Sequence, residues 1–356
     1  KKVVGLHSLR KKSLVLSAVS SSVFTLLTIF VLHSYYVKHD SFVLLLSFLV
    51  LPLHAVSLLN SAFTRGMDHV VASQIPELLV RNTTNFLILF TCTVIFNQPL
   101  EIDVVVRALI YSHIISLLAS TLIFHIFRHK IYNKNDVEIF QWKNFKRIVP
   151  LTMISAVYLI NTQYDILVIS YFLLPSDVGV YKATVQLSVL MTVSLTLIQQ
   201  VFQPKVVNLF ATDRMVELQK LMQTTSFVLF SFSVAFFGIY LFLGEFVLTK
   251  VFGQAFENGY WCLIVLSAGQ LINAYFGPLG TVLNMAEKEQ LVLKSAIISL
   301  LINVTLSTLL VGTYGKIGPA IGTMISLIAF NVALYVSVMR SVGIKPLAHE
   351  KFLKRL

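Results

Sequence analysis

Leu291–Thr313 reads LVLKSAIISLLINVTLSTLLVGT, a run of 23 residues whose only charged side chain is Lys294. As an α-helix rising 1.5 Å per residue it would be about 35 Å long, and the hydrocarbon core of a bilayer is about 30 Å thick. A helix pairs every backbone group within itself, which a lone strand in lipid cannot do. We therefore predict that this stretch is a transmembrane helix.

Stretches of this kind recur along the chain of 356 residues, which is 56% hydrophobic and 12% charged, with a mean hydropathy of +0.80. A soluble domain of this length could not bury so much apolar surface, so lipid must act as the solvent for much of it. We predict an all-α integral membrane protein with about ten transmembrane helices. The predicted spans are Ser13–Tyr35, Ser41–Ala62, Leu78–Asn97, Val104–Phe127, Val149–Leu173, Gly179–Gln203, Thr224–Leu243, Tyr260–Met285, Leu291–Thr313 and Ile317–Met339.

Lysine and arginine are distributed unevenly between the connectors. If the N-terminus faces the cytoplasm and the ten spans alternate, 23 of the 28 Lys and Arg residues lie on the cytoplasmic side. This positive-inside asymmetry predicts that both ends of the chain are cytoplasmic. The net charge of +12 then follows from topology, and no nucleic acid partner is expected.

The longest polar stretch, Arg128–Arg147, separates four predicted spans from six. Connectors elsewhere are too short to hold a further domain, so we place the boundary between two helical lobes in this stretch. The predicted architecture is a two-lobed polytopic bundle. Its parts are an N-lobe (1–130), a cytoplasmic inter-lobe loop (131–147), a C-lobe (148–345) and a cytoplasmic tail (346–356).

The two lobes share a weak internal repeat. Leu59–Gly66 and Leu279–Ala286 each end a predicted span, and each is followed by a polar turn and a helix that opens with similar residues. Both spans are interrupted, the first by Pro52 and the second by Gly277-Pro278. Paired breaks of this kind are typical of transporter repeats, although Pro and Gly are also ordinary in membrane helices.

A second polar segment, Asn208–Gln223, carries apolar side chains among charged ones. This pattern predicts a short amphipathic helix that lies at the cytoplasmic interface. The alternative interpretation is that the segment holds the solvated ends of two long helices.

Several short runs resemble polysaccharide and O-antigen flippases of the multidrug/oligosaccharidyl-lipid/polysaccharide exporter superfamily. Asp165–Val168, followed by Leu174–Ala183 (LPSDVGVYKA), resembles the junction between the seventh and eighth helices of these proteins. Tyr314–Thr323 (YGKIGPAIGT) resembles their last loop and the start of helix twelve. The matches keep the family order over residues 160–325. Further matching runs are Gln203-Pro204, Val251–Phe256 and Val282–Met285.

The resemblance implies twelve helices in two six-helix lobes around a cavity, working by alternating access. The first four spans would be helices three to six, the other six would be helices seven to twelve, and two helices would precede Lys1. It also implies a Wzx-type flippase, driven by a proton or sodium gradient as an antiporter or by the downhill removal of product outside. Such a protein carries undecaprenyl-diphosphate-linked glycan repeats across a bacterial inner membrane for O-antigen, capsule or exopolysaccharide synthesis. Its partners would be this lipid-linked oligosaccharide, membrane lipids and a glycan polymerase.

Asp165 lies deep in a predicted span, whereas the other fifteen acidic residues lie in connectors or near span ends. A carboxylate at that depth is expected to face protein or water and is a functional candidate. Lys182 lies on the next helix at a depth that differs by about 4–5 Å, so we predict that the two pair. Either Asp165 exchanges a coupling cation while Lys182 meets a substrate phosphate, or the pair only holds two helices together.

Three arginines are further candidates for binding an anionic substrate. Arg81 and Arg107 each lie about four residues inside a predicted span, where they either extend to the interface or face the cavity. Arg65 ends an interrupted span on the cytoplasmic side, where it would meet an entering diphosphate or only anchor the helix. Polar side chains that either join helices or line a sugar-conducting cavity are Asn161, Gln163 and Tyr181.

The sequence holds no Walker loop, dinucleotide fingerprint, nucleophile elbow or HExxH motif. Cys92 and Cys262 fall inside spans, and His54, His113 and His125 stand at no metal-ligand spacing. We therefore expect no catalytic residue, no metal site and no cofactor. The rival functions are a multidrug extruder or a lipid II flippase of the same superfamily, a membrane-embedded polysaccharide polymerase or acyltransferase, and a scaffold without transport.

Overall fold

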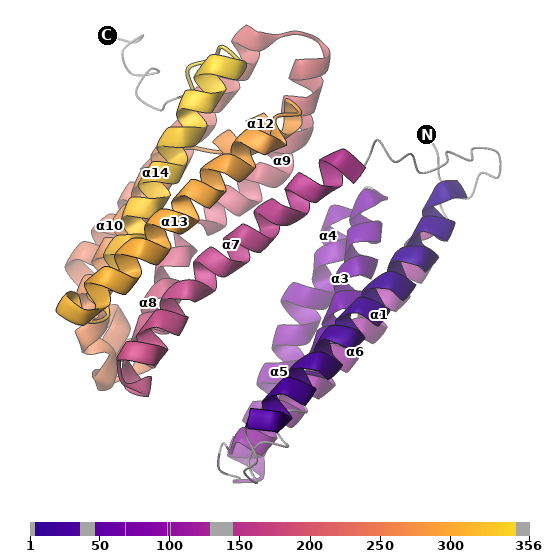
Figure 1. Cartoon of the computed structure of the whole chain (residues 1–356), viewed down its shortest axis with the longest axis vertical. Coiled ribbons are helices and arrows are strands. Elements are labelled where there is room, and N and C mark those ends of the chain that lie inside the picture. Colours follow the sequence, from indigo (N-terminus) through magenta and orange to yellow (C-terminus); the bar gives the residue numbers. More distant parts are fainter. Residues whose placement is uncertain are drawn as a thin grey trace. The chain divides into compact units, whose positions relative to one another are not determined.

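The computed structural model describes residues 4–35, 47–67, 69–97, 99, 101–128 and 145–346, which form helices joined by short turns, without a strand in these ranges. The chain divides into two compact units, Lys1–Gln141 (unit 1) and Trp142–Leu356 (unit 2) (Figure 1). The division falls in the polar stretch that was expected to separate two lobes. The assignment of these lobes to the helices of the family pattern stays a prediction.

Unit 1 is built on α3, which packs against both α1 and α6. Its buried side chains are small and polar, and they allow the neighbouring helices to approach closely. The segments from α4 to η2 follow one another as a single apolar helix over Val71–Ile95, interrupted by two π-helical stretches. The elements are α1 (Val4–Tyr35), α3 (Val50–Gly66), α4 (Val70–Gln74), η1 (Ile75–Val80), α5 (Arg81–Phe90), η2 (Thr91–Ile95) and α6 (Ile102–Arg128).

In unit 2, α13 packs against α14 and α7, and α11 packs against α14 and α8. The break predicted at Gly277-Pro278 is confirmed, because α11 and α12 meet there at an angle of 44°. Gly277 has a φ of +71°, which favours glycine. The elements are α7 (Phe145–Phe172), α8 (Pro175–Leu190), α9 (Val193–Ala211), α10 (Met215–Phe252), η5 (Gln254–Gly259), α11 (Tyr260–Phe276), α12 (Leu279–Met285), α13 (Glu289–Tyr314) and α14 (Ile317–Ser341).

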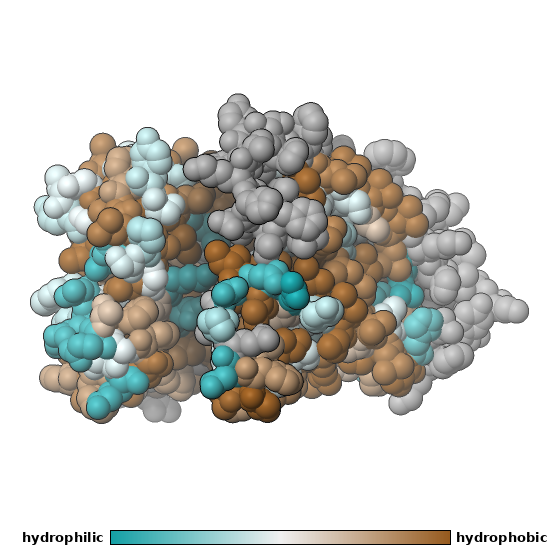
Figure 2. Space-filling model, turned by 90° about the horizontal axis from the view of Figure 1, so that it is seen from below, coloured by the Kyte–Doolittle hydropathy of each residue, from teal (hydrophilic) through white to brown (hydrophobic). Residues whose placement is uncertain are grey.

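Apolar side chains cover much of the surface, as Figure 2 shows for one face. Phe242 and Tyr171, for example, are each 83% exposed, whereas many serines are buried between helices. This distribution is typical of helices that face lipid outside and pack through small residues inside. Six described helices are long and apolar enough to cross a membrane, or seven if the bent pair α11–α12 counts as one span. A membrane protein with several spans is thus confirmed, while the count of ten and the internal repeat stay predictions.

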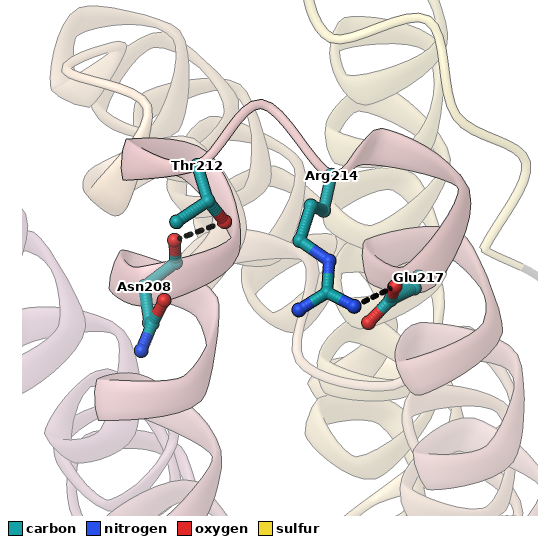
Figure 3. A network of polar contacts seen from close by, with 4 residues as sticks. All are labelled: Asn208, Thr212, Arg214 and Glu217. Carbon is teal, nitrogen blue, oxygen red and sulfur yellow. Dashed lines mark hydrogen bonds and ion pairs between the residues drawn. The ribbon is translucent and has the colours of Figure 1, made fainter.

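The interfacial helix predicted at Asn208–Gln223 is wrong, and the alternative interpretation holds. The segment consists of the end of α9, a turn, and the start of α10. The hydroxyl of Thr212 donates a hydrogen bond to the carbonyl of Asn208 at 2.9 Å, and Arg214 pairs with Glu217 in the first turn of α10 (Figure 3). Most apolar side chains of the segment, such as Leu209, Phe210 and Leu218, pack into the core of unit 2 because they continue the inner faces of these two helices, whereas Val216 is exposed.

Candidate functional site

Asp165 lies in α7, seven residues or about 10 Å before the end of the helix, and it is only 4% exposed. Three hydroxyl groups from three other helices donate to its carboxylate. Tyr181 of α8 donates to Oδ2 at 2.8 Å, Ser307 of α13 donates to Oδ1 at 3.1 Å, and Thr323 of α14 donates to Oδ2. A buried carboxylate is thus the meeting point of four helices.

Two amides extend this group, which we call the Asp165 cluster (Asn161, Asp165, Tyr181, Asn303, Ser307 and Thr323). Asn303 donates to the Oδ1 atom of Asn161 at 2.8 Å. The Oδ1 atom of Asn303 lies 2.9 Å from the hydroxyl of Ser307 and 3.4 Å from that of Thr323. Each of these two hydroxyls has one proton, which it can donate either to Asn303 or to Asp165.

Two glycines of α14 bring this helix close enough to α13 for the hydroxyls to converge. A Cβ atom at Gly322 would lie 2.5 Å from the hydroxyl oxygen of Ser307, and one at Gly318 would lie 2.5 Å from the carbonyl oxygen of Leu310. Side chains at these positions would therefore force the two helices apart. The sequence Gly318-Pro319-Ala320-Ile321-Gly322 thus places Thr323 beside Asp165.

The predicted pair between Asp165 and Lys182 is wrong. Tyr181 is buried and points to Asp165, whereas Lys182, the next residue of α8, is exposed. Successive residues of an α-helix point about 100° apart, so both cannot face the same carboxylate. The prediction compared how far along their helices the two residues lie, but it did not consider on which face of α8 Lys182 lies.

No ion pair of the described residues includes Asp165. One ion pair of this unit joins Lys316, just before α14, to Asp177 in the first turn of α8 at 2.8 Å. In the described ranges, no group of three or more His, Cys, Asp or Glu side chains is placed to hold a metal ion. The Asp165 cluster can instead offer one carboxylate with hydroxyl and amide oxygens, the ligand type that hard cations prefer.

The other predicted site residues are not brought together. Gln163 is exposed, and Asn161 is half-buried as part of the Asp165 cluster. Arg107 is exposed and pairs with Asp103 one turn earlier on α6, at 2.5 Å. Arg65 is exposed in the last turn of α3. That these residues contact the substrate stays a prediction.

Arg81 lies deeper in the membrane span than the sequence predicted. The span was expected to begin at Leu78, but the apolar helix begins at Val71 and ends at Ile95. Arg81 is therefore about 15 Å from one end of this helix and about 21 Å from the other, further inside than the four residues expected from the sequence. Its guanidinium lies 3.4 Å from the Nδ1 atom of His54 on α3.

Sequence reasoning missed Ser307 and Thr323, although α13 carried a usable signal. Its buried polar residues Ser295, Ser299, Asn303 and Ser307 recur at every fourth position in a span that is otherwise apolar. This spacing puts them on one face of the helix, where they must contact other helices. Thr323 had no comparable signal, because its role depends on the close approach at Gly322.

No model of a known protein family matches the sequence. Two curated proteins are similar to it. The capsular polysaccharide biosynthesis protein CapF of Staphylococcus aureus is 26% identical over 206 residues, which is 58% of this chain and 52% of that protein. The probable low-salt glycan biosynthesis flippase Agl15 of Haloferax volcanii is 25% identical over 185 residues, which is 51% of this chain and 38% of that protein. The chain thus spans about half or less of the length of these relatives.

Solved transporter structures share the arrangement of helices. A MATE protein, solved as a point mutant, superposes with a TM-score of 0.73 over 96% of this chain and 78% of that one, at 14% identity. The chain has the MATE fold. A MOP superfamily transporter from Pyrococcus furiosus with the same fold gives a TM-score of 0.68 over 93% of this chain and 77% of that one, at 12% identity.

The resemblance predicted from the sequence is confirmed by these comparisons. Both curated relatives carry names from glycan biosynthesis, and both solved structures are transporters of the MATE and MOP group. The likeness shows that this chain shares the many-helix membrane fold of these transporters.

Proposed function

We propose that this chain is part of a flippase that moves undecaprenyl-diphosphate-linked glycan repeats across a bacterial inner membrane. A polar headgroup cannot enter hydrocarbon, so alternating access between two helical units would shelter it while the lipid tail stays in the bilayer. The names of the two curated relatives support a glycan cargo. The positive-inside asymmetry supports cytoplasmic ends, and a glycan polymerase would use the product.

The observation that carries the proposal is the buried carboxylate of Asp165. Its described partners are hydroxyl groups, which donate hydrogen bonds but bring no positive charge. A buried charge without a counter-charge is costly, and binding a cation would remove that cost. We therefore propose that Asp165 binds the coupling ion, a proton or a sodium ion, and that the ion gradient drives transport.

The predicted substrate contacts follow from the same proposal. Arg81, which lies well inside the apolar helix Val71–Ile95, is the proposed contact for the diphosphate. Tyr181 and Asn161 would respond to the cargo through the Asp165 cluster to which they belong. Further contacts along the path of the cargo are proposed for Arg65, Arg107, Lys182 and Gln163.

Transport in proteoliposomes tests the function directly. A fluorescent undecaprenyl-diphosphate oligosaccharide is placed in one leaflet, and its arrival in the other is followed with a quencher that cannot cross the membrane. We expect flux that requires a sodium or proton gradient and is lost in Asp165→Asn. Arg214→Gln, which removes an exposed pair at the α9–α10 turn, serves as the control and should keep the flux.

A multidrug extruder is the second candidate, because the solved structures with this fold include MATE proteins. An anionic centre such as Asp165 would also suit a cationic drug. The same proteoliposomes loaded with ethidium discriminate the two functions. Gradient-driven ethidium movement without movement of the glycan lipid would contradict the flippase.

A further inference from the structure

Three ionisable side chains meet within unit 1, and the Asp165 cluster does not involve them. Arg81 of α5 lies with its Nη1 atom 3.4 Å from Nδ1 of His54 on α3. The ring of His54 meets the ring of His113 on α6 edge to face, with centroids 5.4 Å apart. His113 is buried, and the other two side chains are half-buried. We call this group the His54–Arg81–His113 cluster.

Arg81 and His113 lie near the middle of two long apolar helices, and His54 lies in the second turn of α3 beside them. His113 is about 16 Å from the start of α6 and about 22 Å from its end, a depth similar to that of Arg81 in its own span. Ionisable residues at such depth are rare and generally serve a function.

A π-helical turn of the backbone determines the position of Arg81. In the π-helical stretch η1, the N–H of Arg81 donates to the carbonyl of Pro76, five residues earlier. The same carbonyl accepts a hydrogen bond from the hydroxyl of Ser116 on α6 at 2.8 Å. The wider turn changes the face on which Arg81 lies, and π-helical turns within α-helices are frequent at functional sites.

The hydrogen bonds define where protons are held. Arginine can only donate, so Nδ1 of His54 must offer a lone pair, and this ring is neutral in the contact. Nδ1 of His113 lies 2.7 Å from the carbonyl oxygen of Leu109, which can only accept, so Nδ1 carries a hydrogen. The Nε2 atom of His113 is then the position for a second proton.

The helices that carry or pack against these residues also hold other charged groups. Glu77 lies one turn before Arg81, and its Oε1 atom is buried without a hydrogen-bond partner. Arg81 acts on Glu77 through space, and Arg65 of α3 does so less strongly. On α1, Arg10 donates to Asn60 at 2.7 Å. On α6, His113 is the group that acts on His54.

We propose that the His54–Arg81–His113 cluster binds a phosphate-type anion together with one or more protons. Protonation of His54 alone would place two cations 3.4 Å apart and break its contact with Arg81. With a phosphate group between them, both would donate to its oxygens, and a protonated His113 would add a further positive charge. Anion binding and proton uptake are therefore coupled, and affinity rises as the pH falls.

This inference rests on the proposed function for the identity of the anion, which is the diphosphate of the carried lipid. It adds a second proton-binding group, separate from Asp165. Because anion and proton bind together, loss of the diphosphate from this site promotes loss of the proton, and loss of the proton promotes loss of the diphosphate.

Calorimetry with farnesyl diphosphate as the probe tests the site in detergent-solubilised protein. Titrations at one pH in two buffers with different ionisation enthalpies give the number of protons taken up on binding. We expect net uptake, and tighter binding at about pH 6 than at about pH 7.5. The second pKa of a phosphate is about 6, so the probe itself loses charge at low pH and would bind more weakly without the protein's protons. Farnesol, which lacks the diphosphate, should not bind.

Variants assign the effect to its residues. Arg81→Gln should weaken binding by about tenfold or more, the effect of losing one charge-assisted hydrogen bond, and Arg81→Lys should restore part of it. His54→Gln and His113→Gln should reduce proton uptake and flatten the pH dependence. His125→Gln is the matched control, because it removes an exposed histidine of the same helix as His113.

Unchanged proton uptake in a His54→Gln/His113→Gln double variant would overturn the proposal, as would wild-type affinity in Arg81→Gln. The proposed function fails separately. If the protein moves the glycan lipid but does not bind farnesyl diphosphate with proton uptake, the proposed anion site is refuted and the proposed flippase function is not. Proton-linked binding without glycan flux removes the flippase and leaves the site.

Discussion

The substitution Asp165→Asn removes the negative charge of the Asp165 cluster and turns one carboxylate oxygen into an NH2 group. The hydroxyls of Tyr181, Ser307 and Thr323 can rotate to accept as well as donate, so the contacts survive in neutral form. A hydrogen bond to a charged group contributes about 1.5–3 kcal/mol and a neutral one about 0.5–1.5 kcal/mol, so three bonds lose about 3 kcal/mol. The cost of burying the charge, several kcal/mol, is removed at the same time. Without a bound cation, the two proteins should therefore be about equally stable.

A bound cation separates the two proteins. A ligand at about 100 times its Kd stabilises the folded state by about 2.7 kcal/mol, and only the wild type should gain this. At about 2–4 °C per kcal/mol for a domain of about 150–250 residues, the wild-type Tm should rise by about 5–10 °C.

The assay is thermal unfolding in detergent, with sodium chloride compared with choline chloride at equal ionic strength, over a series of pH values. Asp177→Asn is the matched control, since it removes the carboxylate that pairs with Lys316 in the same unit and should keep the response. A wild-type Tm that responds to neither sodium nor pH, or an equal response in Asp165→Asn, would refute the cation site.

Three further substitutions test the geometry of unit 2. Gly322→Val should lower the free energy of unfolding by about 1–3 kcal/mol, because its Cβ would lie 2.5 Å from the hydroxyl oxygen of Ser307 on α13. Gly312→Val is the control, because nothing lies within 4 Å of a Cβ atom there. Equal Tm values for the two variants would refute the close approach of α13 and α14. Tyr181→Phe should cost about 1.5–3 kcal/mol and reduce the cation-dependent rise in Tm, since it removes a 2.8 Å hydrogen bond to a carboxylate. Lys182→Met should leave the cation-dependent rise in Tm unchanged. If this variant lost the rise, the pairing of Lys182 with Asp165 predicted from the sequence would be supported after all.

The helical membrane architecture could be predicted from the sequence because it depends on composition and on the length of apolar runs. Span ends were harder to predict. The helix that carries Arg81 begins at Val71 because Val70–Ala72 continues its apolar character, while Ser73, Gln74 and Glu77 were taken for a connector. Polar residues that are buried by neighbouring helices look like loop residues in the sequence alone. The Asn208–Gln223 segment failed for another reason: the exposed ends of two packed helices show the same mixture of apolar and charged residues as one amphipathic helix.

The candidate site could be predicted in part. Asp165 was identified because a single acid deep in an apolar span has few structural explanations. Its partners could not be identified, since hydroxyl residues are common in membrane helices and their convergence depends on helix packing. The wrong choice of Lys182 over Tyr181 shows that depth must be combined with helical face, a difference of one residue and about 100°.

The two charged clusters form within separate units, since Asp165 takes its described partners from unit 2 and Arg81 takes His54 from unit 1. The proposed alternating access requires that a cation at the first site and an anion at the second both shift one conformational equilibrium, and so influence each other. Linkage requires this influence to be reciprocal. The factor by which sodium changes the affinity for farnesyl diphosphate must equal the factor by which farnesyl diphosphate changes the affinity for sodium. Typical couplings of this kind are about 5–150-fold. The Asp165→Asn variant should reduce the first factor to one while leaving the anion site intact. If both factors are one in the wild type, no shared equilibrium connects the sites, and ion-driven alternating access is refuted.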